Sequence, residues 1–253
     1  MKDHEDIDHI LKHWPFDPTS VTVRKIWVDS RNVLQLRLDM GILQMETVHR
    51  PDGKRPHGAK TYFDYLRKQI RKKKKEFELS EEQCAEIDRE FVQYYHRRVC
   101  WLHLHEFENA VMDADHTLQL MDLCREHSKD EDWTVSHEQY RPFVLYHRTQ
   151  AAALAIVETE VANAGEFAID QVNIGLAKIQ QLFVEYDATE QFSEDDLVLQ
   201  LIDFRENLRR RFEIDKTSEE RLAEAVKNED YELAASLRDE LSRRETKPDT
   251  NVP

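Results

Sequence analysis

One loop gathers the side chains most suited to binding chemistry. The stretch RPDGKRPHG places Arg50, Lys54, Arg55 and His57 beside glycines that allow backbone N–H groups to converge, and a helix is expected from Thr61. Cationic side chains and converging N–H groups before a helix N-terminus form a typical anion-binding arrangement. Prolines that fix a tight connection between a sheet and a helix explain the same residues. We favour the connection and keep the anion site as an alternative.

Histidines that lie near other metal-binding residue types raise the question of a metal site. The sets are His9 with His13, His103 with His105 and Glu106, and Asp113 with Asp115 and His116. The first set lies near the end of the chain, where no closed cavity is expected, and neighbours one or two residues apart face different sides of a helix. No Ser-His-Asp or Cys-His arrangement is visible. We therefore expect no metal, no cofactor and no catalytic residues.

The elements around the loop follow from periodicity. Alternating residues in Val21–Val28 and Val33–Met40, separated by the turn DSRN, predict an antiparallel β-hairpin, which Ile42–Val48 extends past a bulge at Gly41. From Ala59 to Arg141 the chain contains neither proline nor glycine, which favours helices. We expect a β-region over residues 1–58 that packs on a helical body over residues 59–213, with Thr61 as the first helix cap.

The helical middle has a repeat-like spacing. Trp101, Leu104, Phe107 and Ala110 lie where a tetratricopeptide repeat, a helix-turn-helix unit, places its aromatic, turn and small residues, and His105 takes the usual glycine position. The triplet Tyr-His-Arg at 95–97 recurs at 146–148 and is followed by Gly165 and Phe167, which predict a second turn. The segment resembles the tetratricopeptide family, and this resemblance implies a small bundle of helical hairpins.

Composition narrows the classes of function. The formal net charge of -15 opposes non-specific attraction to nucleic acid and to anionic membranes. The longest apolar run, Ala151–Val157, is far shorter than the ~18 residues of a membrane span. Three separated cysteines without a CxxC pair fit free thiols in a reducing compartment. We expect a cytoplasmic protein without direct contact to nucleic acid or membrane.

The C-terminal part predicts a second helical hairpin over residues 214–247, followed by a disordered tail over residues 248–253. TSEE has the form of a capping box with Thr217 as N-cap, and NED at 228–230 interrupts the helical pattern. Each arm carries an apolar stripe, and so small a hairpin buries too little to be stable alone. The expected partner-binding residues are Leu222, Val226, Tyr231, Ala234, Leu237, Arg238 and Leu241.

The same stretch, LAEAVKNEDYELAASLRDEL, resembles the UVR motif at the C-terminus of UvrB and within UvrC, the bacterial excision-repair subunits. The resemblance rests on the acidic Glu229-Asp230, the aromatic Tyr231, the paired Ala234-Ala235 and the triplet 237–239, Leu-Arg-Asp. It implies a contact with another protein, made by one hairpin on a partner or by two hairpins in self-association. The whole chain resembles bacterial proteins that contain a UvrB/UvrC motif.

These observations predict a mainly α fold: a bundle of tetratricopeptide-like helical hairpins with a small N-terminal antiparallel β-element and a C-terminal UVR αα-hairpin. The leading hypothesis is an interaction or adaptor protein that uses the hairpin and the helical body. One alternative is an accessory factor of bacterial nucleotide excision repair, recruited by the same motif. Another is an enzyme that uses the Arg50–Gly58 loop.

Overall fold

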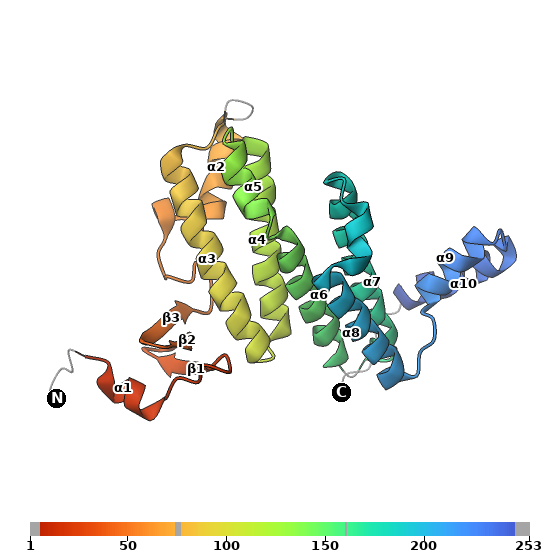
Figure 1. Ribbon diagram of the computed structural model, residues 1–253, viewed down its shortest axis with the longest axis horizontal. Helices are drawn as coiled ribbons and strands as arrows, with labels where there is room; N and C mark the ends of the chain where they lie inside the picture. The colour runs from red at the N-terminus through yellow and green to blue at the C-terminus, as the bar shows by residue number, and fades with distance from the viewer. Residues whose placement is uncertain (1–5, 74–76, 160, 246–253) are drawn as a thin grey trace. The chain divides into compact units, whose positions relative to one another are not determined.

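The structure is a computed structural model that describes residues 6–73, 77–159 and 161–245 (Figure 1). Helices hold 67 % of the residues, and the only strands in these ranges form one small sheet, so the predicted mainly α class is confirmed. The chain divides into two compact units, Met1–Ala151 and Ala152–Pro253. The predicted boundaries at 58, 213 and 247 stay predictions, and the predicted tail, 248–253, lies outside the described residues.

The elements follow one another in a simple order. The first unit begins with α1 (Asp8–His13), β1 (Val23–Val28), β2 (Arg31–Leu38), β3 (Gly41–Glu46), η1 (Pro56–Gly58), α2 (Tyr62–Lys73), α3 (Glu81–His103), α4 (Phe107–His127) and α5 (Glu131–Glu138). The remaining elements are α6 (Arg141–Val157), α7 (Ala164–Glu185), η3 (Thr189–Glu194), α8 (Asp196–Phe212), α9 (Ser218–Lys227) and α10 (Tyr231–Glu245). No helix within the described ranges combines the length and the hydropathy needed to cross a lipid bilayer.

The sheet is antiparallel with the order β1-β2-β3. The turn that joins β1 to β2 lies in the predicted DSRN stretch but is shorter, because Arg31 and Asn32 already belong to β2. Its two central residues, Asp29 and Ser30, have φ values of 47° and 62°. Positive φ at both positions is what a type I′ turn requires, and its twist matches that of the flanking strands. The first hairpin therefore forms as its sequence predicts.

The prediction for the next segment was wrong. Residues 42–48 do not extend the second strand past a bulge, because the chain reverses after Leu38 and Gly41 begins a separate strand, with Leu38 opposite Gly41. β2 is thereby the central strand and is covered on both faces. Val33 and Leu34 are fully buried and Arg37 is nearly so, whereas Met40 in the turn is 90 % exposed. The alternating pattern did not distinguish a turn from a bulge at this point.

A buried carboxylate holds the start of α2 in the first unit. The predicted cap Thr61 accepts a hydrogen bond from the backbone N–H of Asp64 at 3.0 Å. Glu90 of α3, which is fully buried, accepts the N–H groups of Tyr62 and Phe63 at 2.7 and 3.0 Å. These contacts satisfy N–H groups that a helix leaves without an internal partner. The adjoining core unites apolar side chains of α2, α3, α4 and α6, among them Leu66, Ile87, Leu120 and Val144.

Helices α3 and α4 form an antiparallel hairpin. His105, in the turn between them, has φ 59°, the left-handed conformation in which glycine is usual. Ala110 is fully buried near the start of α4. Arg97 of α3 makes a two-pronged ion pair with Asp113 of α4 (2.8 and 2.6 Å), and it also donates to the carbonyl of His49 at 2.7 Å. One buried guanidinium thus joins both helices to the segment after the sheet.

The second unit contains α7 and α8 packed side by side (Figure 1). Fully buried Ile169, Val172 and Ile179 of α7 and Val198 and Leu201 of α8 belong to its core. The predicted second turn differs from the structure: α7 begins at Ala164, so Gly165 and Phe167 lie inside its first turn. The tetratricopeptide assignment itself stays a prediction.

Candidate functional site

The C-terminal hairpin forms as its sequence predicts, from α9 and α10. Thr217 accepts a hydrogen bond from the N–H of Glu220, whose carboxylate in turn accepts the N–H of Thr217, so the capping box is complete. The connection closes with bonds from the N–H groups of Asp230 and Glu229 to the carbonyls of Ala225 and Val226. Glu229 takes a positive φ of 59° there.

The two helices fill the seam between them with their own side chains. Ala225, Ala234 and Leu237 are 3 %, 3 % and 2 % exposed, and Leu222 packs against them. Two of the predicted partner-binding residues, Ala234 and Leu237, are therefore interior residues of the hairpin. Their first role is to hold α9 and α10 together.

Other predicted residues lie on the surface. Val226 and Tyr231 are 54 % and 68 % exposed at the two sides of the connection, and Leu233, which the sequence analysis did not single out, is 41 % exposed. Arg238 is exposed on α10, and Leu241 is half-buried. The structure therefore separates the predicted set into a filled seam and an exposed apolar end.

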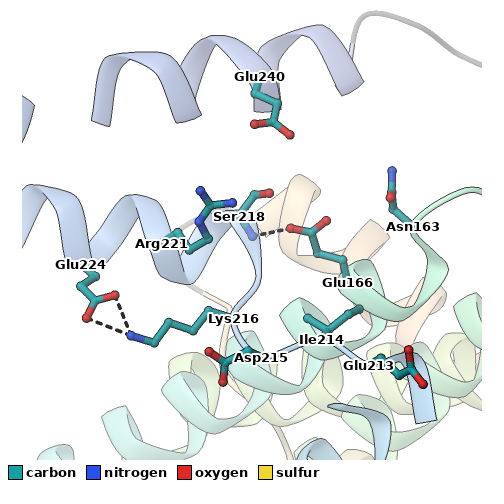
Figure 2. A pocket seen from close by; sticks show the side chains of 10 residues that line it. All are labelled: Asn163, Glu166, Glu213, Ile214, Asp215, Lys216, Ser218, Arg221, Glu224 and Glu240. Carbon is teal, nitrogen blue, oxygen red and sulfur yellow. Dashed lines mark hydrogen bonds and ion pairs between the residues drawn. The ribbon is translucent and has the colours of Figure 1, made fainter. Parts of the chain in front are cut away.

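The opposite end of the hairpin is attached to α7 and α8. Thr217 and Ser218 are buried: the Thr217 hydroxyl donates to Asp170 of α7 at 2.6 Å, and the Ser218 N–H donates to Glu166. Figure 2 shows Glu166 directed at Ser218 across this junction. Residues 226–233, in contrast, are all exposed. The hairpin is thus attached through the start of α9 at Thr217 and Ser218, which we call its open end. It presents residues 226–233 around the connection, its closed end, to solvent.

Glu220 links the capping box to the helices beneath. It accepts hydrogen bonds from Asn173 of α7 and from Arg209 of α8. Burial works against its charged form, but bonds from Arg209, Thr217 and Asn173 outweigh burial and lower the pKa of Glu220. For Asp170, burial dominates over the bond from Thr217, and its pKa is raised to about 6. The junction therefore contains one stably charged carboxylate and one that is held near its titration point.

A hollow of about 570 Å³ lies beside this junction, and mostly charged side chains line it (Figure 2). Glu213, Asp215, Glu224 and Glu240 contribute to its wall together with Lys216, whose ammonium group is bound to Glu224 at 2.7 Å. Acidic groups outnumber basic ones, so the hollow does not favour anions. Glu240 reaches toward it from α10.

The structure brings the four predicted anion-binding residues to one hollow of about 600 Å³ in the first unit. Arg50, Lys54, Arg55 and His57 line it together with acidic Glu82 and Glu86. Arg50 is only 2 % exposed, and its guanidinium lies 3.0 Å from Glu86, 3.4 Å from Asp52 and 3.7 Å from Glu90. Its charge is already balanced, which leaves Lys54 and Arg55 as the cations of the loop. The anion site stays a prediction.

The remaining residue types that could take part in chemistry are histidine, cysteine and the acidic residues. Within residues 6–73, 77–159 and 161–245, no three His, Cys, Asp or Glu side chains lie together as a metal site would require. All three cysteines are free thiols. Burial raises the pKa of Cys100 to about 12 and that of Cys124 still further, so these two remain protonated at neutral pH.

Sequence reasoning missed the residues that attach the hairpin. Glu166 and Asp170 stand 52 and 47 positions before the residues they contact, and α7 gives no local signal of those contacts. The exposure of Leu233 could not be read from its spacing, because Leu233 stands four residues before Leu237 and continues the apolar stripe in the sequence.

Comparisons with known proteins match the same segment. A family model described as the UvrB/uvrC motif matches residues 216–246, which are α9, α10 and the residues next to them. The search of curated proteins and the search of solved structures found no match for the chain. The predicted UVR motif is thus confirmed for this segment.

Proposed function

We propose that the chain is an interaction protein that binds another protein through the exposed, closed end of its C-terminal hairpin. The observation that supports this proposal most directly is the arrangement of apolar side chains in the UVR-type segment. The seam is complete without a partner, while Val226, Tyr231 and Leu233 remain exposed around the connection. Tyrosine is enriched among the residues that dominate protein interfaces, and exposed apolar side chains grouped around it mark an interaction site.

The attachment of the hairpin supports this use. Its open end is buried on α7 and α8, so the closed end is held in a defined position rather than on a free tether. A preorganised surface loses less conformational entropy when it binds. The net charge of -15 favours a protein partner with basic groups around its apolar contact over nucleic acid.

We further propose that the pair α3–α4 is a tetratricopeptide-like unit of an adaptor body. The left-handed His105 in the turn and the buried Ala110 support it, because that repeat needs a glycine-like turn and a small residue near the helix crossing. The proposed division into a β-region, a helical body and the hairpin follows from the same assignment. The hairpin proposal does not depend on it.

The test compares two exposed tyrosines of the second unit. Tyr231→Ser removes the ring at the closed end, and Tyr186→Ser removes a ring that is 54 % exposed after α7. Each full-length variant is immobilised and used to capture proteins from lysate, and its sedimentation is measured to detect self-association. We expect Tyr231→Ser to lose a captured protein or a dimer that Tyr186→Ser retains. Identical behaviour of the two variants and the unchanged chain would contradict the proposal.

The match to the UvrB/uvrC motif also favours a second candidate, association with excision-repair proteins. Purified UvrB and UvrC provide the discriminating experiment, because the same Tyr231→Ser and Tyr186→Ser pair can be tested against each. Binding of either protein that depends on Tyr231 would place the interaction in repair. Binding of the chain to DNA alone at moderate salt would instead favour a direct role on nucleic acid.

A further inference from the structure

The first unit contains another hollow besides the one at the Arg50–Gly58 loop. It has a volume of about 640 Å³ and lies among α3, α4, α5 and α6. It is lined mostly by apolar atoms, and its volume falls within the ~300–1,000 Å³ range of small-molecule sites. The apolar side chains that matter most are Phe91, Tyr95, Met121, Tyr140, Phe143 and Val144. No part of the proposed hairpin function uses this hollow.

One face of α3 forms the length of the hollow and places polar groups toward its two ends. Asp88, Val92, Tyr95 and Arg98 recur at intervals of three or four residues, so they lie on one side of the helix. Ten residues separate Asp88 from Arg98, which corresponds to about 15 Å along the axis. Asp88 accepts hydrogen bonds from the indole of Trp133 and from His137, both at 2.9 Å.

Arg98, at the other end, is a buried cation without an acidic partner. Its side chain is among the largest fully buried ones, with 1 % exposure. Its Nε lies 3.4 Å from Nδ1 of His147, and its Nη1 donates to the Thr117 hydroxyl at 3.2 Å. Within the described part of the chain, no carboxylate lies in ion-pair contact with it. The neighbouring Arg97 differs in this respect, because it takes both carboxylate oxygens of Asp113.

The charge states follow from this environment. Burial lowers the pKa of Arg98 to about 10, so the guanidinium remains protonated at neutral pH. Burial and the nearby charge of Arg98 lower the pKa of His147 to about 4, so this ring is neutral at pH 7. It accepts the hydrogen bond from Arg98 and carries no positive charge that would compete with Arg98 for an anion. Asp113 stabilises the Arg98 charge only from beyond ion-pair distance, because Arg97 takes both of its oxygens, so a carboxylate in direct contact with Arg98 would stabilise this buried charge further.

We propose that this hollow binds a small organic carboxylate with an apolar body, whose carboxylate contacts Arg98 and whose body lies along Phe91, Met121 and Phe143. A guanidinium matches the geometry of a carboxylate, and the apolar lining stabilises the rest of such a ligand. The negative charge of Asp88 at the far end sets the orientation, because it disfavours a second anionic group there. An inorganic anion would leave the apolar lining without a contact.

The experiment measures binding of decanoate and decanol to the full-length chain by titration calorimetry at pH 7.5. The two probes share the same apolar body and differ in the charged group. A hydrogen-bonded charge pair contributes enough for a ten- to hundredfold difference, on the order of the effect of hydrogen bonds to charged groups. We expect decanoate to bind more tightly by this factor, and Arg98→Met to abolish the difference while decanol binding is retained.

A second pair of variants tests the location. Val92→Trp fills the hollow from α3 at a position that is 55 % exposed, whereas Val184→Trp adds the same ring at a 60 % exposed position on α7. The first should remove decanoate binding and the second should not. Equal affinities for the two probes, no binding of decanoate, or unchanged binding in Val92→Trp would overturn the proposal. Should Arg98→Met fail to fold, the comparison of probes and the Val92→Trp result decide alone.

Discussion

Replacing Gly165 by alanine tests the packing that positions the hairpin. Gly165 lies in the first turn of α7 against the ring of Phe212, the last residue of α8. A Cβ atom at Gly165 would lie 2.3 Å from Cγ and 2.6 Å from Cβ of Phe212. Both are atoms close to the backbone, so the clash cannot be relieved by rotating the far end of the side chain.

Two opposing effects decide whether Gly165→Ala lowers or raises the free energy of unfolding. Alanine is favoured over glycine in a helix by at most about 1 kcal/mol, and less near the N-terminus. Overpacking of a close contact costs about 1–3 kcal/mol. The clash is therefore expected to win, and Gly165→Ala should destabilise the second unit. Phe212 also precedes the linker to Thr217, so its displacement should loosen the attachment of α9.

The assay uses the distribution of tryptophans. All four, Trp14, Trp27, Trp101 and Trp133, belong to the first unit, so their fluorescence follows that unit alone, while circular dichroism follows both. In urea, Gly165→Ala should shift the dichroism transition of the second unit and leave the fluorescence transition unchanged. In a Phe212→Ala background, the same substitution should cost less, because the contact with the ring is removed while the contact with Cβ of residue 212 remains. A second unit that is equally or more stable in Gly165→Ala would show that the clash with Phe212 does not outweigh the helix preference of alanine.

Three further predictions follow from other buried contacts. Ala110→Leu should overpack the start of α4 and destabilise the first unit by about 1–3 kcal/mol in urea unfolding, and an unchanged transition would contradict the close helix crossing. Arg97→Met should cost about 3–5 kcal/mol by leaving the buried Asp113 carboxylate without a counter-ion, and the double variant Arg97→Met/Asp113→Leu should recover part of that loss in the same assay, because the Trp101 indole and the His49 carbonyl still lose their partners. Asp170 has a pKa of about 6 in the folded chain against an ordinary 3.8, so its contribution to stability is full below about 3.8 and is lost as pH rises through 6. Hydrogen exchange at Thr217 and Ser218 should therefore be slower at pH 5 than at pH 7 after correction for intrinsic rates, and Asp170→Asn should remove the difference.

Local signals predicted those parts of the fold that depend on a few adjacent residues. The capping box of Thr217 and Glu220 involves residues three positions apart, and the DSRN turn connects strands that are neighbours in the chain. Both could be read directly from the sequence. The segment at Gly41 shows the limit, because alternating strands on either side of a tight turn have the same pattern as one strand with a bulge.

The candidate site was predictable only in part. Its helices and their apolar stripes followed from periodicity. That Leu237 is buried while Tyr231 is exposed depends on how closely α9 approaches α10. Asp170 and Arg98 acquire their surroundings from residues 47 and 49 positions away. Periodicity within a helix carries no information about such contacts, so tertiary structure was needed to find them.

The proposed function requires that the closed end of the hairpin contacts another protein chain. A photo-crosslinking amino acid placed at Tyr231 of the full-length chain, in the cells that produce it naturally, tests that contact directly, with Tyr186 as the control position. We expect a discrete adduct with one protein, either a second copy or a different chain, from position 231 and none from position 186. Absence of an adduct at position 231, or the same adducts from both positions, would contradict the proposed function.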